Sequence, residues 1–294
     1  MHLVADIIKS MKKRIVTVFA NNTKISQDTV KMLSSKLKES GFSVSYTFSP
    51  ESEMIMCIGG DGAFLTAVHD CNFPSIPFVG INTGHLGFFQ EISPSQIDSF
   101  LENYKQGKYH IQRLKTVRAD VTTKDKIIEH VALNEIVVKG GDSYPIHLNI
   151  SIGGSFIECF SGDGILTATP AGSTAYNYSL GGSIVDPRLN LLQVTPIAPM
   201  NTTAYRSFTS SILLPSDLSL GVMPESEEDY DMIISTDGIE RKYSNISLIK
   251  ICFSETIINL IRFESYDFWN KVKTKFLDDR IDEDNKNDKA DTNE

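Results

Sequence analysis

The sequence predicts an α/β N-terminal domain with an open, mostly parallel, Rossmann-like sheet, followed by an antiparallel all-β domain. The chain has 294 residues, about twice the length of a typical domain. Strand and helix patterns alternate over residues 12–114, as they do in parallel α/β folds. Over residues 115–263 short alternating strands dominate with few helical stretches, which is typical of an antiparallel β domain.

The first domain shows its strands as short apolar runs and its helices as 3.6-residue periodicity. Residues 15–19 form a β-branched run, and Ser26 is predicted to cap a helix that ends before Gly41. Residues 54–58 and 77–81 have the continuous apolar character of buried strands. The other expected elements are a strand over 42–46, a helix through Phe64, Leu65 and Val68, and a helix over 93–104.

In the second domain, two glycine turns separate alternating runs. Gly153-Gly154 and Asp237-Gly238 are both typical of β-hairpins. Residues 264–277 return to helical spacing through Tyr266, Trp269, Val272 and Phe276, a stripe that predicts a helix packing back on the fold. A partner interface is the lesser alternative for that stripe.

Composition excludes several classes of protein. The formal net charge of −9 disfavours a nucleic-acid binder, which needs clustered Lys and Arg. Residues 278–294 hold eight acids and three bases and are predicted to be a disordered acidic tail. We expect no membrane span, because no uncharged stretch is apolar enough, and no signal peptide at the N-terminus. With four cysteines and no CxxC pair, a cytoplasmic location is expected; Met1 and Met11 are both possible starts.

Gly59-Gly60-Asp61-Gly62 follows a buried strand and opens a helix. Glycines let backbone amides approach phosphate oxygens, and the helix N-terminus favours an anion. Asp61 is placed to bind a divalent metal or to accept a proton from an attacking hydroxyl. The alternative is a tight turn with a capping aspartate, and this motif alone does not decide between them.

Two shorter motifs are also candidates. Asn82-Thr83-Gly84-His85-Leu86-Gly87-Phe88-Phe89 follows the next strand, and its lone histidine is more often structural than catalytic. Asn134-Glu135 lies within an apolar run, 131–138, that predicts one continuous strand. Its carboxylate suits vicinal sugar hydroxyls and its amide suits a base edge; an exposed pair on an edge strand is the alternative.

The longest motif runs from Ser161 to Gly182 and includes Gly162-Asp163-Gly164 and Thr169-Pro170-Ala171-Gly172-Ser173-Thr174-Ala175-Tyr176-Asn177. Its glycines and hydroxyls supply the donors that a nucleotide needs, and a purely structural loop of this length is uncommon. Ser173-Thr174 is predicted to cap a helix that begins near Ala175.

In this order and spacing the four motifs resemble the NAD kinase family, over about residues 14–277. The resemblance implies transfer of the ATP γ-phosphoryl to the adenosine-ribose 2′-hydroxyl of NAD, with Mg²⁺ accompanying ATP, no metal ligated by side chains, and a homodimer or homotetramer. Asp61 resembles the family's proton acceptor, Asn134 and Glu135 its adenine and ribose contacts, and Asp163 a residue contributed by a neighbouring subunit. The other positions carried over are Gly59, Gly60, Gly62, Phe64, Thr174, Ala175, Tyr176, Asn177, Ser179 and Ala198.

Three positions depart from the family pattern. Ala63 stands where threonine is frequent, Ala171 where serine or threonine is usual, and Ser161 where a basic residue is frequent. These departures bear on how the phosphates are bound and on which phosphoryl donor the enzyme prefers. The rival functions are a lipid kinase that shares the glycine turn, a catalytically silent nucleotide sensor, and a dehydrogenase, which lacks GxGxxG. Asp61, Asn134 and Glu135 together favour the kinase.

Overall fold

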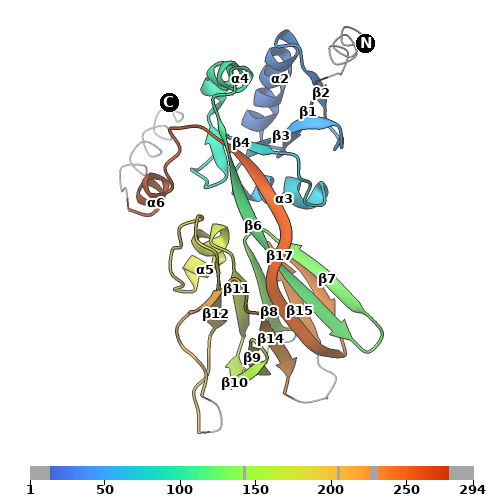
Figure 1. The fold of residues 1–294 in the computed structure, drawn as a ribbon, viewed down its shortest axis with the longest axis vertical. Coiled ribbons are helices and arrows are strands. Elements are labelled where there is room, and N and C mark those ends of the chain that lie inside the picture. Colours follow the sequence, from blue (N-terminus) through green and yellow to red (C-terminus); the bar gives the residue numbers. More distant parts are fainter. Residues whose placement is uncertain (1–13, 142–143, 204–205, 226–230, 278–294) are drawn as a thin grey trace, which may run out of the picture. The chain divides into compact units, whose positions relative to one another are not determined.

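The computed structural model describes residues 14–141, 144–203, 206–225 and 231–277 (Figure 1). The described residues form two compact units. Unit 1 comprises residues up to Gln112 together with those from Asn259 onward, and unit 2 is Arg113–Ile258. The expected acidic tail and the alternative start at Met11 lie outside the described residues.

Unit 1 is built on a parallel sheet. Its strands pair in the order β2-β1-β3-β4, every pair parallel, with β5 and the end of β17 also pairing with β4. The prediction of an open, mostly parallel sheet is confirmed, although β5 carried no clear sequence signal. The bounds are β1 Ile15–Ala20, β2 Ser43–Ser45, β3 Ser52–Gly59, β4 Phe78–Asn82, β5 Gln90–Ile92 and β17 Ile246–Arg262.

Helices cover both faces of this sheet, because alternate residues of a strand point to opposite sides. On one face Met54 and Met56 of β3 share a core with Leu33 and with Phe100. On the other face the ring of Phe64 packs against Phe78, with centroids 5.5 Å apart. The helices are α2 Lys24–Glu39, α3 Asp61–Asp70, the 3-10 turn η1 Pro94–Gln96, α4 Ile97–Lys105 and α6 Phe268–Phe276.

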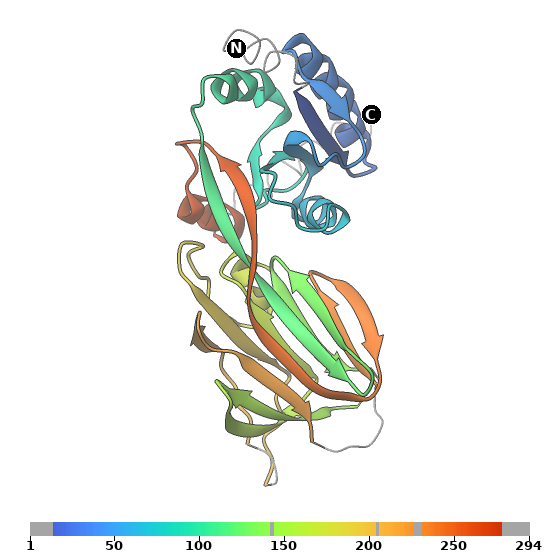
Figure 2. The ribbon, with the colours of Figure 1, turned by 45° about the vertical axis from the view of Figure 1, so that its right-hand side comes forward.

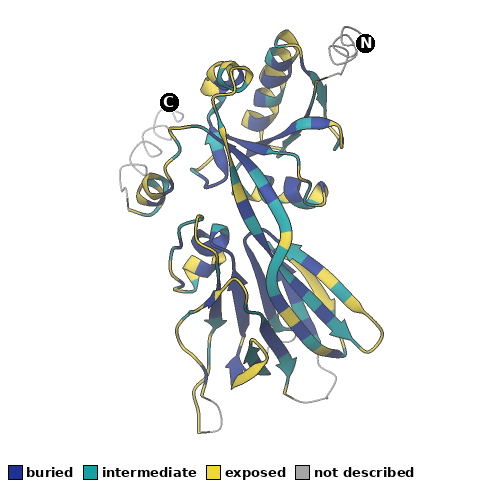
Figure 3. Ribbon diagram, in the orientation of Figure 1, coloured by how far each residue is buried: buried dark blue, intermediate teal, exposed yellow. Residues whose placement is uncertain are grey.

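Two details of the helices differ from the sequence prediction. The cap of α2 is Thr23, whose hydroxyl accepts the Ser26 amide at 3.3 Å, so the helix begins before Ser26. In α6 Val272 is buried as predicted, but Trp269 is 51% exposed and Phe268 is buried in its place. The helix has a buried and an exposed side, as Figure 3 shows, and Trp269 lies on the exposed one.

Unit 2 is a two-sheet β structure. One sheet contains β10-β9-β14-β17 with β6 and β7, and β6 lies beside β17 (Figure 2); the other has the order β13-β12-β11-β8-β15-β16. Inward-facing side chains of both sheets form one apolar core. The bounds are β6 His110–Thr123, β7 Ile127–Ala132, β8 Glu135–Gly140, β9 Ile146–Ile152, β10 Ser155–Gly162, β11 Gly164–Ala168, β12 Leu191–Ile197, β13 Ile212–Pro215, β14 Leu220–Pro224, β15 Met232–Thr236 and β16 Ile239–Tyr243.

Both predicted hairpins are present in unit 2. β9 and β10 are joined through Gly153-Gly154, and β15 and β16 through Asp237-Gly238, all four with positive φ. The continuous strand expected over 131–138 is wrong, because β7 ends at Ala132 and β8 begins at Glu135. None of the helices within the described ranges is long and apolar enough to cross a membrane.

Candidate functional site

The glycine turn in unit 1 joins β3 to α3, and its glycines differ in what they allow. Gly59 has φ +149°, and a β-carbon there would lie 2.6 Å from that of Ala63, so glycine is required. A β-carbon on Gly60 or Gly62 would meet nothing within 4 Å. The backbone at the N-terminus of α3 is therefore open to a ligand, the arrangement that suits a phosphate.

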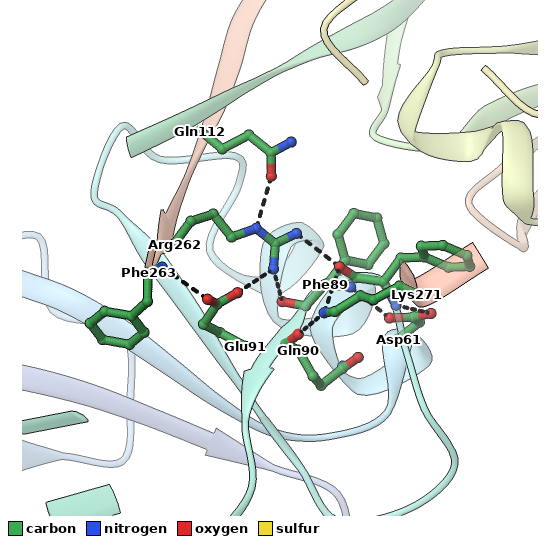
Figure 4. A network of polar contacts seen from close by, with 9 residues as sticks. Asp61, Phe89, Gln90, Glu91, Gln112, Arg262, Phe263 and Lys271 are labelled. Carbon is green, nitrogen blue, oxygen red and sulfur yellow. Dashed lines mark hydrogen bonds and ion pairs between the residues drawn. The ribbon is translucent and has the colours of Figure 1, made fainter. Parts of the chain in front are cut away.

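Asp61, the first residue of α3, is held by the segment after β4. Its Oδ2 accepts the Phe88 amide at 3.1 Å and its Oδ1 accepts the Phe89 amide at 3.0 Å (Figure 4). Lys275 Nζ lies 3.5 Å from Oδ2, and the Asp61 side chain is 26% exposed. A carboxylate offers about four acceptor positions, so one remains for a ligand hydroxyl.

The carbonyls of residues 88–90, the segment whose amides bond to Asp61, accept hydrogen bonds from two cations, Arg262 and Lys271. Arg262 donates to the Phe88 carbonyl at 2.8 Å and pairs with the Glu91 carboxylate at 2.9 Å, and both of these side chains are at most 3% exposed. Lys271 donates to the carbonyls of Phe88 and Gln90. Sequence reasoning missed these residues, since nothing local to 262–275 marks them as partners of the glycine turn.

Phe64 does not lie in the open part of this site. It is fully buried, and its ring stacks on Phe89 with centroids 4.7 Å apart. The Phe64 side chain therefore supports the segment that bonds Asp61, and the expected contact of this residue with a nucleotide stays a prediction. The side chain of His85 is exposed.

Asp237 organises the candidate site in unit 2. Its carboxylate accepts the amides of Leu133, Asn134 and Glu135 at 2.8, 2.7 and 3.2 Å. These bonds explain why the chain turns between β7 and β8 instead of continuing as one strand. The sequence identified Asp237-Gly238 only as a hairpin, because a turn signal does not reveal what its carboxylate bonds.

Asn134 and Glu135 are buried with free polar atoms. Their side chains are 5% and 7% exposed, and Asn134 Oδ1 and Glu135 Oε2 have no hydrogen-bond partner within the described residues. Burial, and then the nearby charge of Asp237, raise the pKa of Glu135 to about 8. Unpaired buried polar atoms are costly, so these two groups are suited to a polar ligand.

The long loop packs directly on this turn. The Thr169 amide donates to the Asn134 carbonyl at 2.8 Å, and a β-carbon on Gly172 would lie 2.1 Å from the same oxygen. Gly172 is therefore required for the close approach. Thr174 is buried, Ala175 is half-buried, and Tyr176 and Ser179 are exposed beyond it.

In this loop the helix cap expected at Ser173 is wrong. Asn177 is fully buried, accepts the Thr195 hydroxyl at 2.7 Å and donates to the Ser173 carbonyl, so its side-chain amide holds the loop. The expected contact of Asn177 with a nucleotide stays a prediction. Ser173 does not cap the short helix α5 (Tyr176–Ser179). Its hydroxyl donates to the Pro170 carbonyl at 2.7 Å and accepts the Val185 amide at 2.9 Å.

Asp163 and Ala198 lie together where β11 begins and β12 ends. The Asp163 amide donates to the Ile197 carbonyl at 3.0 Å, whereas its side chain is exposed. Ala198 is also exposed and adopts φ +44°, which is uncommon for alanine. Ser161, one of the three departures from the family pattern, is buried, and its amide donates to the Ser207 hydroxyl.

The metal-ligating side chains of the described part of the chain are not clustered. Among the residues that the structure describes, no group of three or more His, Cys, Asp or Glu side chains is arranged to hold a metal ion. Asp61 is the acidic side chain at the glycine turn, and a single carboxylate suits a metal that is held mainly by substrate phosphates.

Comparisons with known proteins agree with the motifs. Residues 11–109 match the ATP-NAD kinase N-terminal domain, and residues 133–263 match the ATP-NAD kinase C-terminal domain. The NAD kinase of Finegoldia magna is 39% identical over 90% of this chain and 98% of its own length. The NAD kinase of Streptococcus gordonii is 31% identical over 94% and 100%.

Solved structures show the same fold. A yeast NADH kinase complexed with NADH aligns with a TM-score of 0.78 at 20% identity, covering 89% of this chain and 86% of its own. An NAD kinase from Archaeoglobus fulgidus in complex with ATP aligns with a TM-score of 0.71 at 24% identity, covering 88% and 98%.

Proposed function

The chain belongs to the NAD kinase family and makes NADP from NAD and ATP, and we propose that Asp61 accepts the proton of the ribose 2′-hydroxyl during transfer. The observation that carries this proposal is the fixed Asp61 carboxylate, which two backbone amides orient while 26% of the side chain stays exposed. Phosphoryl transfer depends mainly on positioning and charge neutralisation.

The 2′-hydroxyl donates a hydrogen bond to Asp61 in the ground state. As its oxygen forms a bond to the γ-phosphorus and the bond from that phosphorus to the bridging oxygen of ADP breaks, the proton passes to the carboxylate. Because a sugar hydroxyl is a very weak acid, this transfer comes late. The amides of Phe88 and Phe89 keep the carboxylate oriented throughout.

The exposed backbone at Gly60 and Gly62 is proposed to bind ATP phosphates, since a β-carbon at either position would occupy open space. Mg²⁺ bound to ATP would supply charge neutralisation at those phosphates, which the backbone at Gly60 and Gly62 would hold. The protein's part is then to orient the nucleophile and to hold the phosphates at the start of α3.

Asn134 and Glu135 are proposed to bind the nucleoside of NAD. The free Oε2 of Glu135 suits ribose hydroxyls and the free Oδ1 of Asn134 suits the amino group of adenine. Thr174, Ala175, Tyr176 and Ser179 complete the adenine side. The family match and the two free acceptors favour an NAD kinase over a lipid kinase, because a lipid substrate has no nucleoside for them to bind. The presence of Asp61 favours the kinase over a catalytically silent sensor, which does not need that residue.

We also propose a homo-oligomer, dimer or tetramer, in which Asp163 and Ala198 serve the dinucleotide site of a neighbouring subunit. Both residues are exposed, Asp163 just before β11 and Ala198 just after β12. The terminal strands β10 and β13 expose apolar side chains, Phe156 at 61% and Leu213 at 53%. Exposed sheet edges with apolar residues are places where chains associate.

The test of the function is an assay of purified protein with NAD, ATP and Mg²⁺, with NADP measured through an NADP-specific dehydrogenase. NADP should form only with all three present. NADH and a diacylglycerol, run in parallel as acceptors with labelled ATP, should show whether the glycine turn serves a different substrate. Labelled lipid without NADP would contradict the proposed function.

A further inference from the structure

Residues 88–90 bond to Asp61 through two of their amides and to two cations through their carbonyls (Figure 4). The amides of Phe88 and Phe89 donate to the Asp61 carboxylate. The Phe88 carbonyl accepts from Arg262 at 2.8 Å and from Lys271 at 3.5 Å, and the Gln90 carbonyl also accepts from Lys271. A cation at a carbonyl strengthens the donor character of the peptides along the same chain.

We propose that Lys271 of α6 is a positioning residue for the reaction, and that its ammonium group, with the Arg262 guanidinium, fixes residues 88–90 so that their amides orient the Asp61 carboxylate. The proposal rests on the proposed role of Asp61 as proton acceptor. It gives the C-terminal helix a part in catalysis that none of the four sequence motifs covers.

Arg262 and Lys271 have different parts in this arrangement. The charge of Arg262 is neutralised by Glu91. The Arg262 Nε also donates to Gln112 Oε1 at 2.8 Å, and its Cζ lies 3.7 Å from the centre of the Tyr266 ring. Lys271 lies 5.1 Å from the centre of the Tyr266 ring. Both cations bond main-chain carbonyls of the segment directly, Arg262 those of Phe88 and Phe89 and Lys271 those of Phe88 and Gln90. Arg262 stays protonated at every working pH, so the charge of Lys271 is the one that can be lost.

Burial, and then the charge of Arg262, lower the pKa of Lys271 to about 8. The charged groups that act on it are Arg262 of β17, Glu91 of β5, Asp61 of α3 and Lys275 of its own helix. Below pH 8 the ammonium form predominates, and above pH 8 the charge-assisted bonds to the carbonyls weaken. The proposal therefore expects the rate to fall as pH rises through about 8.

Lys271→Met keeps the length of the side chain and removes the charge, and Lys271→Arg keeps the charge at every working pH. Lys273→Met is the matched control, because Lys273 is exposed on the same helix. For the Met variant we expect kcat to fall about 10- to 100-fold, the cost of a misplaced catalytic group, while KM for NAD stays within threefold. Lys271→Arg should restore most of kcat and remove the fall near pH 8, and Lys273→Met should match the wild type.

Hydrogen exchange gives a readout that does not depend on activity. In Lys271→Met the amides of Phe88 and Phe89 should exchange at least tenfold faster, with α2 and β1 unchanged. If this variant fails to fold, the pH profiles of the wild type and of Lys271→Arg decide the question.

Two results would overturn the proposal: kcat of Lys271→Met within twofold of the wild type, or identical basic limbs in the wild type and Lys271→Arg. Failure of the underlying role looks different. Full turnover in Asp61→Asn would reject Asp61 as proton acceptor, whereas a dead Asp61→Asn beside an unaffected Lys271→Met would reject the Lys271 proposal alone.

Discussion

Asp237 acts on Glu135 in two ways: its Oδ1 accepts the Glu135 amide at 3.2 Å, and its charge adds to burial in raising the pKa of the Glu135 carboxyl to about 8. The same carboxylate thus places Glu135 and disfavours its ionisation. A buried acid with an unpaired oxygen is an unfavourable feature of the fold by itself, which is the cost expected of a ligand-binding group.

Glu135→Gln should therefore stabilise the protein. With a pKa above its ordinary value of 4.5, Glu135 stabilises the fold fully only below pH 4.5, and this contribution is lost as pH rises to about 8. Gln keeps the shape and cannot ionise. The variant should melt at the same temperature as the wild type near pH 4.5 and at a higher temperature by pH 8, as measured by calorimetry. A difference that does not change with pH would contradict the assignment.

Asp237→Ala should loosen the turn that carries Asn134. Three amide bonds to one carboxylate are lost, and a bond to a charged group contributes about 1.5–3 kcal/mol. We expect a clearly lower melting temperature and NAD affinity weakened by about one to two decades. Asp217→Ala, at an exposed position of the same unit, is the control and should change neither. Unchanged NAD affinity in folded Asp237→Ala would show that the turn does not serve the ligand.

Mixing two inactive variants tests the shared site. Asp61→Asn and Asp163→Ala, co-expressed, can assemble one site with both residues intact, which neither homo-oligomer can do. Partial recovery of activity is expected in hetero-oligomers confirmed by sedimentation. No recovery in a demonstrated hetero-oligomer, or full activity of a monomer, would exclude a shared site.

The sequence predicted the elements well because their signals are local. Apolar runs identified β1, β3 and β4 of unit 1, and the Gly153-Gly154 and Asp237-Gly238 pairs identified the hairpins of unit 2. The burial of the Phe64 and Asn177 side chains could not be predicted, because a motif does not tell which way a side chain points. The partnerships of Asp61 with Phe88, Asp237 with Asn134, and Arg262 with Phe88 join residues 27, 103 and 174 positions apart, and no local pattern encodes them.

The most direct test of the central claim is the turnover of Asp61→Asn under saturating NAD, ATP and Mg²⁺, with NAD affinity measured on the same preparation. Asn keeps the shape and an acceptor for one of the two amides but cannot take up the proton, and positioned acid–base catalysis contributes about 10²- to 10⁴-fold. We predict a loss of kcat in that range, with NAD affinity within a few-fold and melting temperature close to that of the wild type. Near-normal turnover would contradict the account and leave Asp61 as a residue that only fixes the segment 88–89.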